Sequence, residues 1–122
     1  MFLKRNQLAE LIPVSATTSN RWFPPTKSGY INGKTIIEML NAHRRNGQPE
    51  VVGWIPHLMT TRQFGEQLGR DGNVKPVSER TVRNWCVSAP HFRIENTILI
   101  DAATMYAWMT SPETEGRVSP VV

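Results

Sequence analysis

The chain has 122 residues, of which 39% are hydrophobic, and its 14 Lys or Arg against 10 Asp or Glu give a net charge of +4. Cys86 is the only cysteine, which excludes an intrachain disulfide, and neither a signal peptide nor a run of roughly 18 apolar residues is present, so we expect a cytoplasmic protein with no membrane contact. The positive charge suits a polyanion as partner, because each phosphate that Lys or Arg neutralises releases a bound counterion.

The first predicted elements are two short helices joined by a tight turn. Pro13 cannot continue the first helix, since it lacks an N–H and clashes with the preceding turn. Ser15 suits the N-cap of the second helix, which runs to about Phe23. Helical spacing in the first helix is shown by Leu8, Leu11 and Ile12. The pattern is that of a helix-turn-helix.

A turn, a short strand and a third helix are expected next. The turn covers residues 27–29, and Tyr30-Ile31 forms the strand. Asn32 caps the third helix, which carries His43-Arg44-Arg45 near its C-terminus. Gly and Pro mark residues 46–53 as a linker.

The second half follows the same plan. Thr60 or Thr61 caps a helix through Leu68, and residues 69–76 replace the tight turn. Ser78 caps the next helix, in which Val82 and Trp85 are spaced to face a core. Residues 91–94 and 97–100 are expected to form a hairpin around Glu95-Asn96, and Asp101 caps a last helix; residues 111–122 lack periodicity and are predicted to be disordered.

An internal repeat supports this reading. Gln7-Leu8-Ala9-Glu10 matches Gln63-Phe64-Gly65-Glu66, and the later matches include Ser15 with Ser78 and Trp22 with Trp85. We therefore predict an α+β, mostly helical fold of two tandem small winged helix-turn-helix units. The predicted division is an N-terminal unit (1–45), a linker (46–53), a C-terminal winged-helix unit (54–110) and a tail (111–122).

Three segments resemble a known family. Residues 59–64, 78–85 and 98–101 are similar to the winged-helix excisionases of temperate phages and integrative elements, which are related to MerR-type DNA-binding domains. The resemblance covers residues 58–109 well and 3–42 more loosely, and the duplication departs from the family. It implies an architectural factor without catalysis, which bends double-stranded DNA beside a recombination site, associates cooperatively on DNA and steers a tyrosine integrase.

The candidate DNA contacts fall into four groups. Glu79, Arg80, Arg83 and Asn84 lie on the outer face of the second helix of the C-terminal unit, where Arg can read guanine and Asn adenine. The corresponding residues of the N-terminal unit, Thr17, Asn20 and Arg21, either read bases or contact the DNA backbone only. Arg93 and Asn96, near the hairpin turn, either enter the minor groove or belong to an ordinary exposed hairpin. The remaining basic residues are candidate phosphate contacts. The full set outside the first group is Thr17, Asn20, Arg21, Lys27, Lys34, Arg44, Arg70, Lys75, Arg93 and Asn96.

Other chemistry finds little support in the sequence. There is no Gly-rich phosphate loop, no HExxH and no nucleophile elbow, so we expect no enzyme, and the scattered His43, His57 and His91 predict no metal or cofactor. Two other functions remain open. One is a transcriptional regulator of a phage, plasmid or island acting by operator occupancy; the other is a protein-interaction module whose N-terminal half has lost DNA binding.

Overall fold

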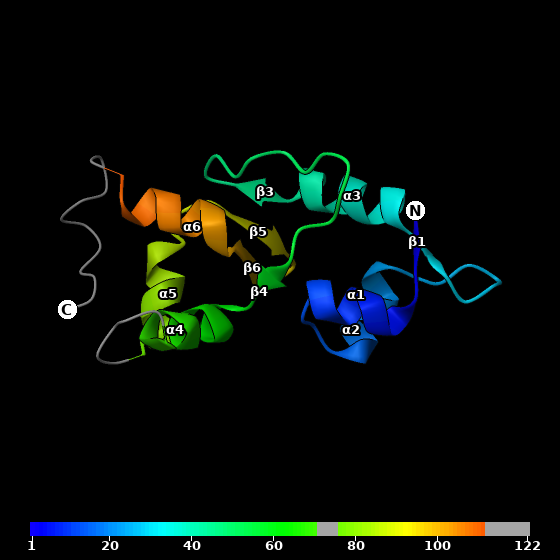
Figure 1. Cartoon of the computed structure of the whole chain (residues 1–122), viewed down its shortest axis with the longest axis horizontal. Helices are drawn as coiled ribbons and strands as arrows, with labels where there is room; N and C mark the ends of the chain where they lie inside the picture. The colour runs from blue at the N-terminus through cyan, green and yellow to red at the C-terminus, as the bar shows by residue number, and fades with distance from the viewer. Residues whose placement is uncertain (71–75, 112–122) are drawn as a thin grey trace.

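The computed structural model describes residues 1–70 and 76–111, and these form an α+β protein with six helices and two antiparallel sheets (Figure 1). The α+β class predicted from the sequence is confirmed, whereas the two winged helix-turn-helix units stay a prediction. The sheets have the strand orders β1-β2 and β3-β5-β6-β4. In chain order the elements are β1 (Phe2–Leu3), α1 (Arg5–Leu11), α2 (Ala16–Trp22), β2 (Ile31–Asn32), α3 (Gly33–Ala42), β3 (Arg44–Arg45), β4 (Leu58–Met59), α4 (Thr61–Arg70), α5 (Glu79–Trp85), β5 (His91–Ile94), β6 (Thr97–Asp101) and α6 (Ala102–Met109).

The two halves of the chain repeat the same strand pairing. In the first half β1 precedes α1 and pairs with β2, so that Phe2 lies opposite Asn32. In the second half β4 precedes α4 and pairs with β6, so that Leu58 lies opposite Asp101. Asn32 and Asp101 occupy the N-cap positions of α3 and α6. The repeat in the sequence thus corresponds to a repeat in backbone hydrogen bonding.

The capping interactions also repeat. Ser15 Oγ accepts from the backbone N–H of Thr18 at 3.2 Å, and Ser78 Oγ accepts from that of Thr81 at 3.2 Å. Each hydroxyl satisfies one of the amide groups that the first turn of a helix leaves without a partner. Before the first helix of each half, a glutamine side chain in the first turn accepts from the backbone N–H of Lys4 (2.8 Å) or Thr60 (3.0 Å).

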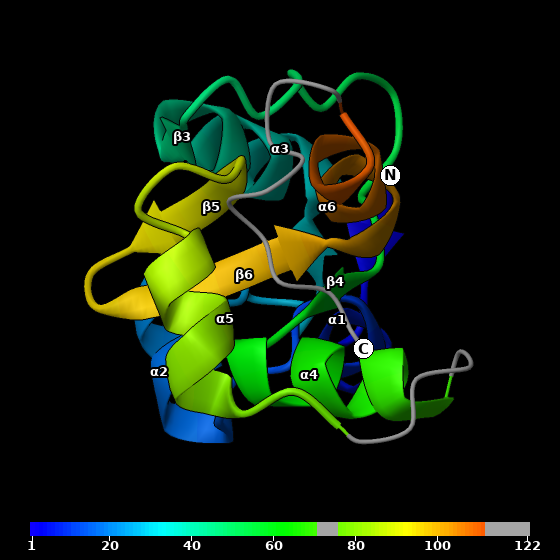
Figure 2. The same cartoon turned by 90° about the vertical axis from the view of Figure 1, so that its left-hand side faces the viewer.

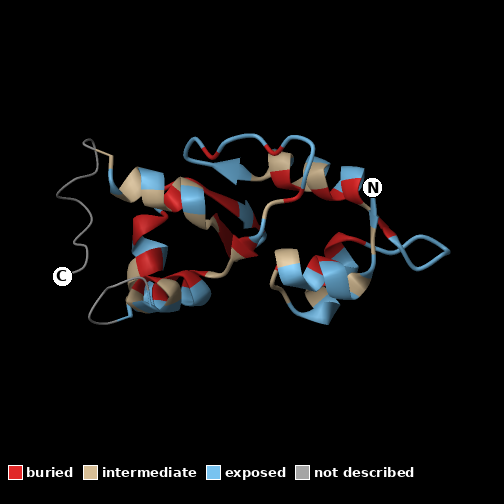
Figure 3. Cartoon of the chain, viewed as in Figure 1, coloured by how far each residue is buried: buried red, intermediate tan, exposed pale blue. Residues whose placement is uncertain are grey.

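The hairpin of β5 and β6 lies between two apolar cores. Phe92, Ile94 and Leu99 belong to one core, which also contains Trp22 and the buried side chains of α1 and α3. Ile98 and Ile100 belong to the other, together with Trp85 and the buried side chains of α4, α5 and α6. Because side chains alternate between the two faces of a strand, one hairpin can line both cores. Figure 3 shows the buried residues along the hairpin and the helices around it.

The region between the halves differs from the expected linker. The sequence places Arg44 and Arg45 at the end of a helix, but α3 ends at Ala42 and both arginines form β3, with Arg44 opposite Phe92 and Arg45 opposite His91. Because β3 pairs with the edge of β5, the backbone groups of both strands find partners. If α3 continued through Arg44 and Arg45, this edge of β5 would have none.

The segment that joins the two halves, residues 46–53, contains two buried side chains. Gln48 is 3% exposed, Val51 7%, and Asn41 exchanges two hydrogen bonds with the Val51 backbone. Two residues of the segment 46–53 are therefore buried, and Asn41 holds the backbone of Val51, so this part of the segment is packed against the N-terminal half. The division of the chain into separate domains stays a prediction.

A close approach in the C-terminal half requires a glycine. Gly65 on α4 packs against the chain that enters α5, and the backbone N–H of Val77 donates to its carbonyl at 3.1 Å. A Cβ at Gly65 would lie 2.1 Å from the carbonyl oxygen of Val77. Only glycine permits this contact, which brings α4 and α5 together.

Two sequence expectations fall outside the described residues. They are the candidate phosphate contact at Lys75 and the disorder of the tail after Ser111.

Candidate nucleic-acid interface

The outer face of α5 carries polar and charged side chains. Glu79, Arg80, Arg83 and Asn84 are all exposed, whereas Val82 and Trp85 are buried in the core beneath them. Arg83 Nε lies 3.5 Å from Glu79 Oε1, one helical turn away. In residues 1–70 and 76–111, the side chains of Arg80 and Asn84 form no hydrogen bond or ion pair. These two are available to a partner as they stand.

The corresponding face of α2 is less charged. Thr17, Asn20 and Arg21 are exposed, while Ser19 and Trp22 are buried. The face occupies the same position relative to the serine cap as the face of α5, because both helices begin one residue after that serine. Arg21 is the only cationic side chain of α2.

α2, α5 and the turn between β5 and β6 lie on the same side of the molecule. Figure 2 shows all three toward the left of the view, with α4 along the bottom. An ion pair joins two of them: Arg21 Nε lies 3.1 Å from Glu95 Oε1, and Arg21 Nη2 lies 2.5 Å from Glu95 Oε2. The guanidinium therefore holds the carboxylate through both oxygens.

This ion pair changes the charge of the shared face. The hydrogen bond from Arg21, and then the nearby indole of Trp22, hold the pKa of Glu95 below its ordinary value, although no hydrogen bond of standard geometry joins the indole. Both side chains of the pair remain about half exposed. A partner that approaches α2 thus meets an arginine already engaged by a carboxylate.

The structure places the hairpin candidates beside this face. Arg93 lies opposite Ile98 on the exposed part of β5, and Asn96 is exposed in the two-residue turn. Their neighbour Glu95 has φ of 57°, in the left-handed region, and it turns the tip of the hairpin toward α2. The tip of the hairpin therefore contacts α2 of the other half.

The candidate phosphate contacts are more dispersed. Lys34 on α3 borders a cavity with Val51 and Val52, and Arg70 at the end of α4 borders a groove that also contains Glu10. Arg44 Nε donates to the carbonyl of Asn41 and its Nη1 to that of Gln48, both at 3.3 Å. Lys27 is exposed in the loop before β2, and Lys75 is outside the described residues. The structure does not bring the four described residues, Lys27, Lys34, Arg44 and Arg70, to one surface.

Three residues that the sequence did not single out organise the site. Glu95 holds Arg21, and Arg5 donates to Ser19 Oγ at 2.7 Å and to the Phe23 carbonyl at 2.9 Å, which ties α1 to the middle and the C-terminal end of α2. The amide of Asn46 donates to backbone carbonyls just after α5. All these contacts join residues 14 or more positions apart, so no spacing in the sequence indicates them.

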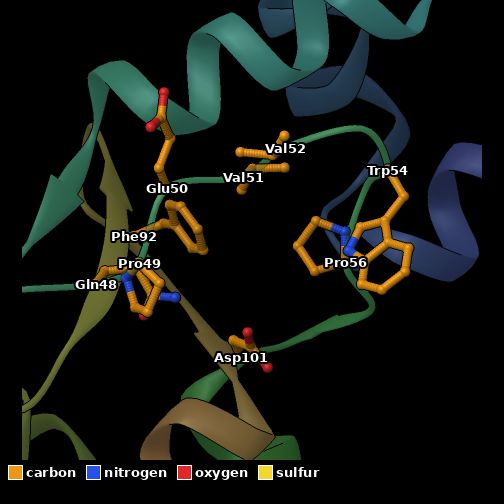
Figure 4. Close-up of a pocket in the computed structure, with 9 residues that line it drawn as sticks. All are labelled: Gln48, Pro49, Glu50, Val51, Val52, Trp54, Pro56, Phe92 and Asp101. Atoms are coloured by element: carbon orange, nitrogen blue, oxygen red, sulfur yellow. The ribbon is translucent and has the colours of Figure 1, made fainter.

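A cavity of about 190 Å³ lies over the segment that follows β3 (Figure 4). Trp54 forms one wall and is 73% exposed, Phe92 and Pro49 lie at the opposite side, and the carboxylate of Asp101 lies between them at the bottom of the view. Its lining consists of Gln48, Pro49, Glu50, Val51, Val52, Trp54, Pro56, Phe92 and Asp101. None of these residues lies on α2 or α5.

Two buried titratable groups lie near the end of α5 and the start of β5. Burial raises the pKa of the Cys86 thiol to about 11, and Arg83 opposes the shift. Burial lowers the pKa of His91, while the Ala89 carbonyl, 2.8 Å from its Nδ1, opposes that shift. Nδ1 therefore carries a proton and donates to this carbonyl, and both groups stay uncharged near neutral pH.

The described part of the chain carries neither a metal-ligand cluster nor a membrane-spanning helix. There, no three His, Cys, Asp or Glu side chains gather as metal ligands would. Residues 1–70 and 76–111 contain no helix with the length and apolar character to cross a bilayer.

Comparisons with known proteins identify no relative. No family model, no curated protein and no solved structure matches the chain.

Proposed function

We propose that the protein binds double-stranded DNA in a sequence-specific manner through the exposed faces of α2 and α5. The observation that carries the proposal is that two helices with the same serine cap, each with exposed polar side chains, lie on one side of the molecule. The major groove admits an α-helix, and each base pair there offers a distinct pattern of donors and acceptors to the exposed side chains.

In this proposal α5 is the principal reading helix. Arg80 and Arg83 suit the O6 and N7 acceptors of guanine, and Asn84 suits adenine. Glu79, which pairs with Arg83, orients that guanidinium or accepts from cytosine. On α2, Asn20 supplies the amide, and Thr17 offers a methyl group for contact with thymine.

The biological role that we propose is that of an architectural factor of the excisionase type. It follows from the resemblance of residues 58–109 to winged-helix excisionases. The protein occupies sites beside a recombination site, bends the DNA, and directs a tyrosine integrase without catalysis of its own. The second candidate is a regulator that blocks a promoter by occupancy, which the same face supports.

Selection from a random duplex library tests the DNA binding. We expect enrichment of one sequence, and Arg80→Ala or Asn84→Ala should weaken binding to it by about tenfold or more while changing binding to unrelated DNA less. Lys34→Ala is the charge-matched control, since Lys34 lies on α3, and it should affect both DNAs equally. Absence of an enriched sequence, or equal losses on both DNAs for Arg80→Ala, would contradict sequence-specific reading by α5.

DNA bending separates the two roles. Mobility of circularly permuted fragments should vary with the position of the bound site for an architectural factor. An occupancy regulator needs no bend, so uniform mobility would favour that role.

A further inference from the structure

We propose that the two halves form one rigid reader, which recognises a single DNA site with a fixed spacing between the bases read by α2 and those read by α5. This inference rests on the proposed function and specifies its substrate. Two units on a free linker would instead accept sites with variable separation, because the linker allows each unit to move independently.

The shared hairpin is the first reason for rigidity. Phe92 and Leu99 are 0% exposed within the core of the N-terminal half, and Ile100 is 0% exposed within the core of the C-terminal half. Moving the halves apart would expose apolar side chains on one face of the hairpin, and such burial is the dominant favourable term in folding. The hairpin of β5 and β6 is therefore a layer shared by the cores of both halves.

Strand pairing adds directional contacts across the same junction. β3 extends the sheet of the C-terminal half, and the backbone N–H of Arg93 donates to the His43 carbonyl at 2.9 Å. These bonds set the orientation of α3 relative to β5, because a strand ladder has a defined register.

Asn46 positions the end of α5. Its Nδ2 lies 3.1 Å from the Cys86 carbonyl, 3.2 Å from that of Val87 and 3.1 Å from that of Ala89. These carbonyls follow the last turn of α5, where a helix lacks internal partners. Asn46 itself has φ of 54°, which asparagine tolerates better than most residues. A side chain from the segment that joins the two halves thus holds the reading helix of the C-terminal half.

The ion pair between Arg21 and Glu95 closes the junction on the reading side. An exposed pair of this kind contributes little to stability. Its contribution is geometric, since it places the N-terminus of β6 beside the C-terminal end of α2. The hairpin tip thereby contacts α2 rather than extending as a free wing.

The test uses the full chain and the DNA obtained by selection. Footprints with Asn20→Ala and Arg80→Ala first identify the bases that depend on α2 and on α5. Insertions of 5 and 10 base pairs then separate these two subsites. DNA has 10–10.5 base pairs per turn, so the longer insertion restores the same face of the duplex. We expect both insertions to lower the affinity by about a hundredfold, to that of one subsite.

Tolerance of the 10-base-pair insertion, with affinity retained within about threefold, would overturn the rigid reader and leave DNA binding intact. A footprint without bases that depend on Asn20 would overturn it as well, because α2 would then read nothing. If selection enriches no sequence, the proposed function itself fails, which is a distinct result.

Asn46→Gly tests the positioning residue. Glycine accepts the φ of 54° without strain, so this substitution removes the amide and spares the backbone. We expect it to weaken binding to the intact site by about tenfold and to reduce the penalty of the 10-base-pair insertion. Trp54→Ala, an exposed change away from α2 and α5, is the control. An unchanged ratio between intact and interrupted sites in Asn46→Gly would contradict the positioning role.

Discussion

Arg21 and Glu95 form an ion pair through both carboxylate oxygens, although 74 positions separate them in the chain. Arg21 belongs to α2, and Glu95 belongs to the turn between β5 and β6. The pair thus connects the exposed face of one half with the hairpin of the other. It also places a carboxylate on the surface that we propose faces DNA.

The first prediction concerns this carboxylate. Glu95→Gln removes a negative charge from the proposed DNA surface and releases Arg21 for a phosphate. We expect binding to the selected DNA to tighten by about twofold to fivefold at low salt, and by less at high salt, because ions screen exposed charges. Titration at several salt concentrations measures the effect. Glu66→Gln on α4, which removes the charge from another exposed ion pair, is the control. Weaker binding by Glu95→Gln would mean that the ion pair positions Arg21 for its contact.

The second prediction concerns the repeated serine caps. Ser15→Ala and Ser78→Ala each remove the oxygen that accepts from an amide of the first helical turn. Loss of such a cap costs about 1 kcal/mol. Because the two caps have the same geometry, we expect similar losses in the free energy of unfolding, measured with urea. Ser88→Ala, at an exposed loop position, is the control. A large difference between the two cap variants would contradict their equivalence.

The third prediction concerns the contact of α4 with the chain before α5. Gly65→Ala introduces a Cβ that would lie 2.1 Å from the Val77 carbonyl oxygen, so the backbone must shift. We expect a loss of about 2–3 kcal/mol in the free energy of unfolding, as for overpacked sites. The neighbouring exposed change Glu66→Ala should alter stability by less than about 0.5 kcal/mol. Full stability of Gly65→Ala would refute the close packing.

The fourth prediction concerns pH. Burial holds the pKa of His91 in the folded protein below 6.5, so the unfolded chain binds the proton more readily. Below pH 6.5 the unfolded state therefore gains protons first, and stability falls with pH until His91 titrates in the folded state as well. Urea unfolding between pH 7.5 and 5 measures this dependence. His91→Asn, whose amide can donate to the Ala89 carbonyl, should reduce the slope between pH 6.5 and 5. The same slope in both proteins would assign the dependence to other groups.

The sequence by itself determined the local elements of this protein. Proline ends α1, serine begins α2 and α5, and Glu95-Asn96 forms the turn of the hairpin. These features depend on residues within four positions of one another, where side-chain oxygens and ring geometry act directly on the backbone. Matching local signals in the two halves also predicted the repeat.

Only the tertiary structure decided how the halves combine. Arg44 and Arg45 are not part of α3, because their backbone groups pair with β5. The side chain of Asn46, which the sequence places in a linker, binds carbonyls 40 or more positions away. The alternation of Phe92, Leu99 and Ile100 predicts strands, but it does not reveal that each face meets a different core. Local spacing carries no information about such contacts, since their energy comes from burial and pairing between distant segments. Whether Arg21 stands alone or beside a carboxylate was therefore settled by the fold.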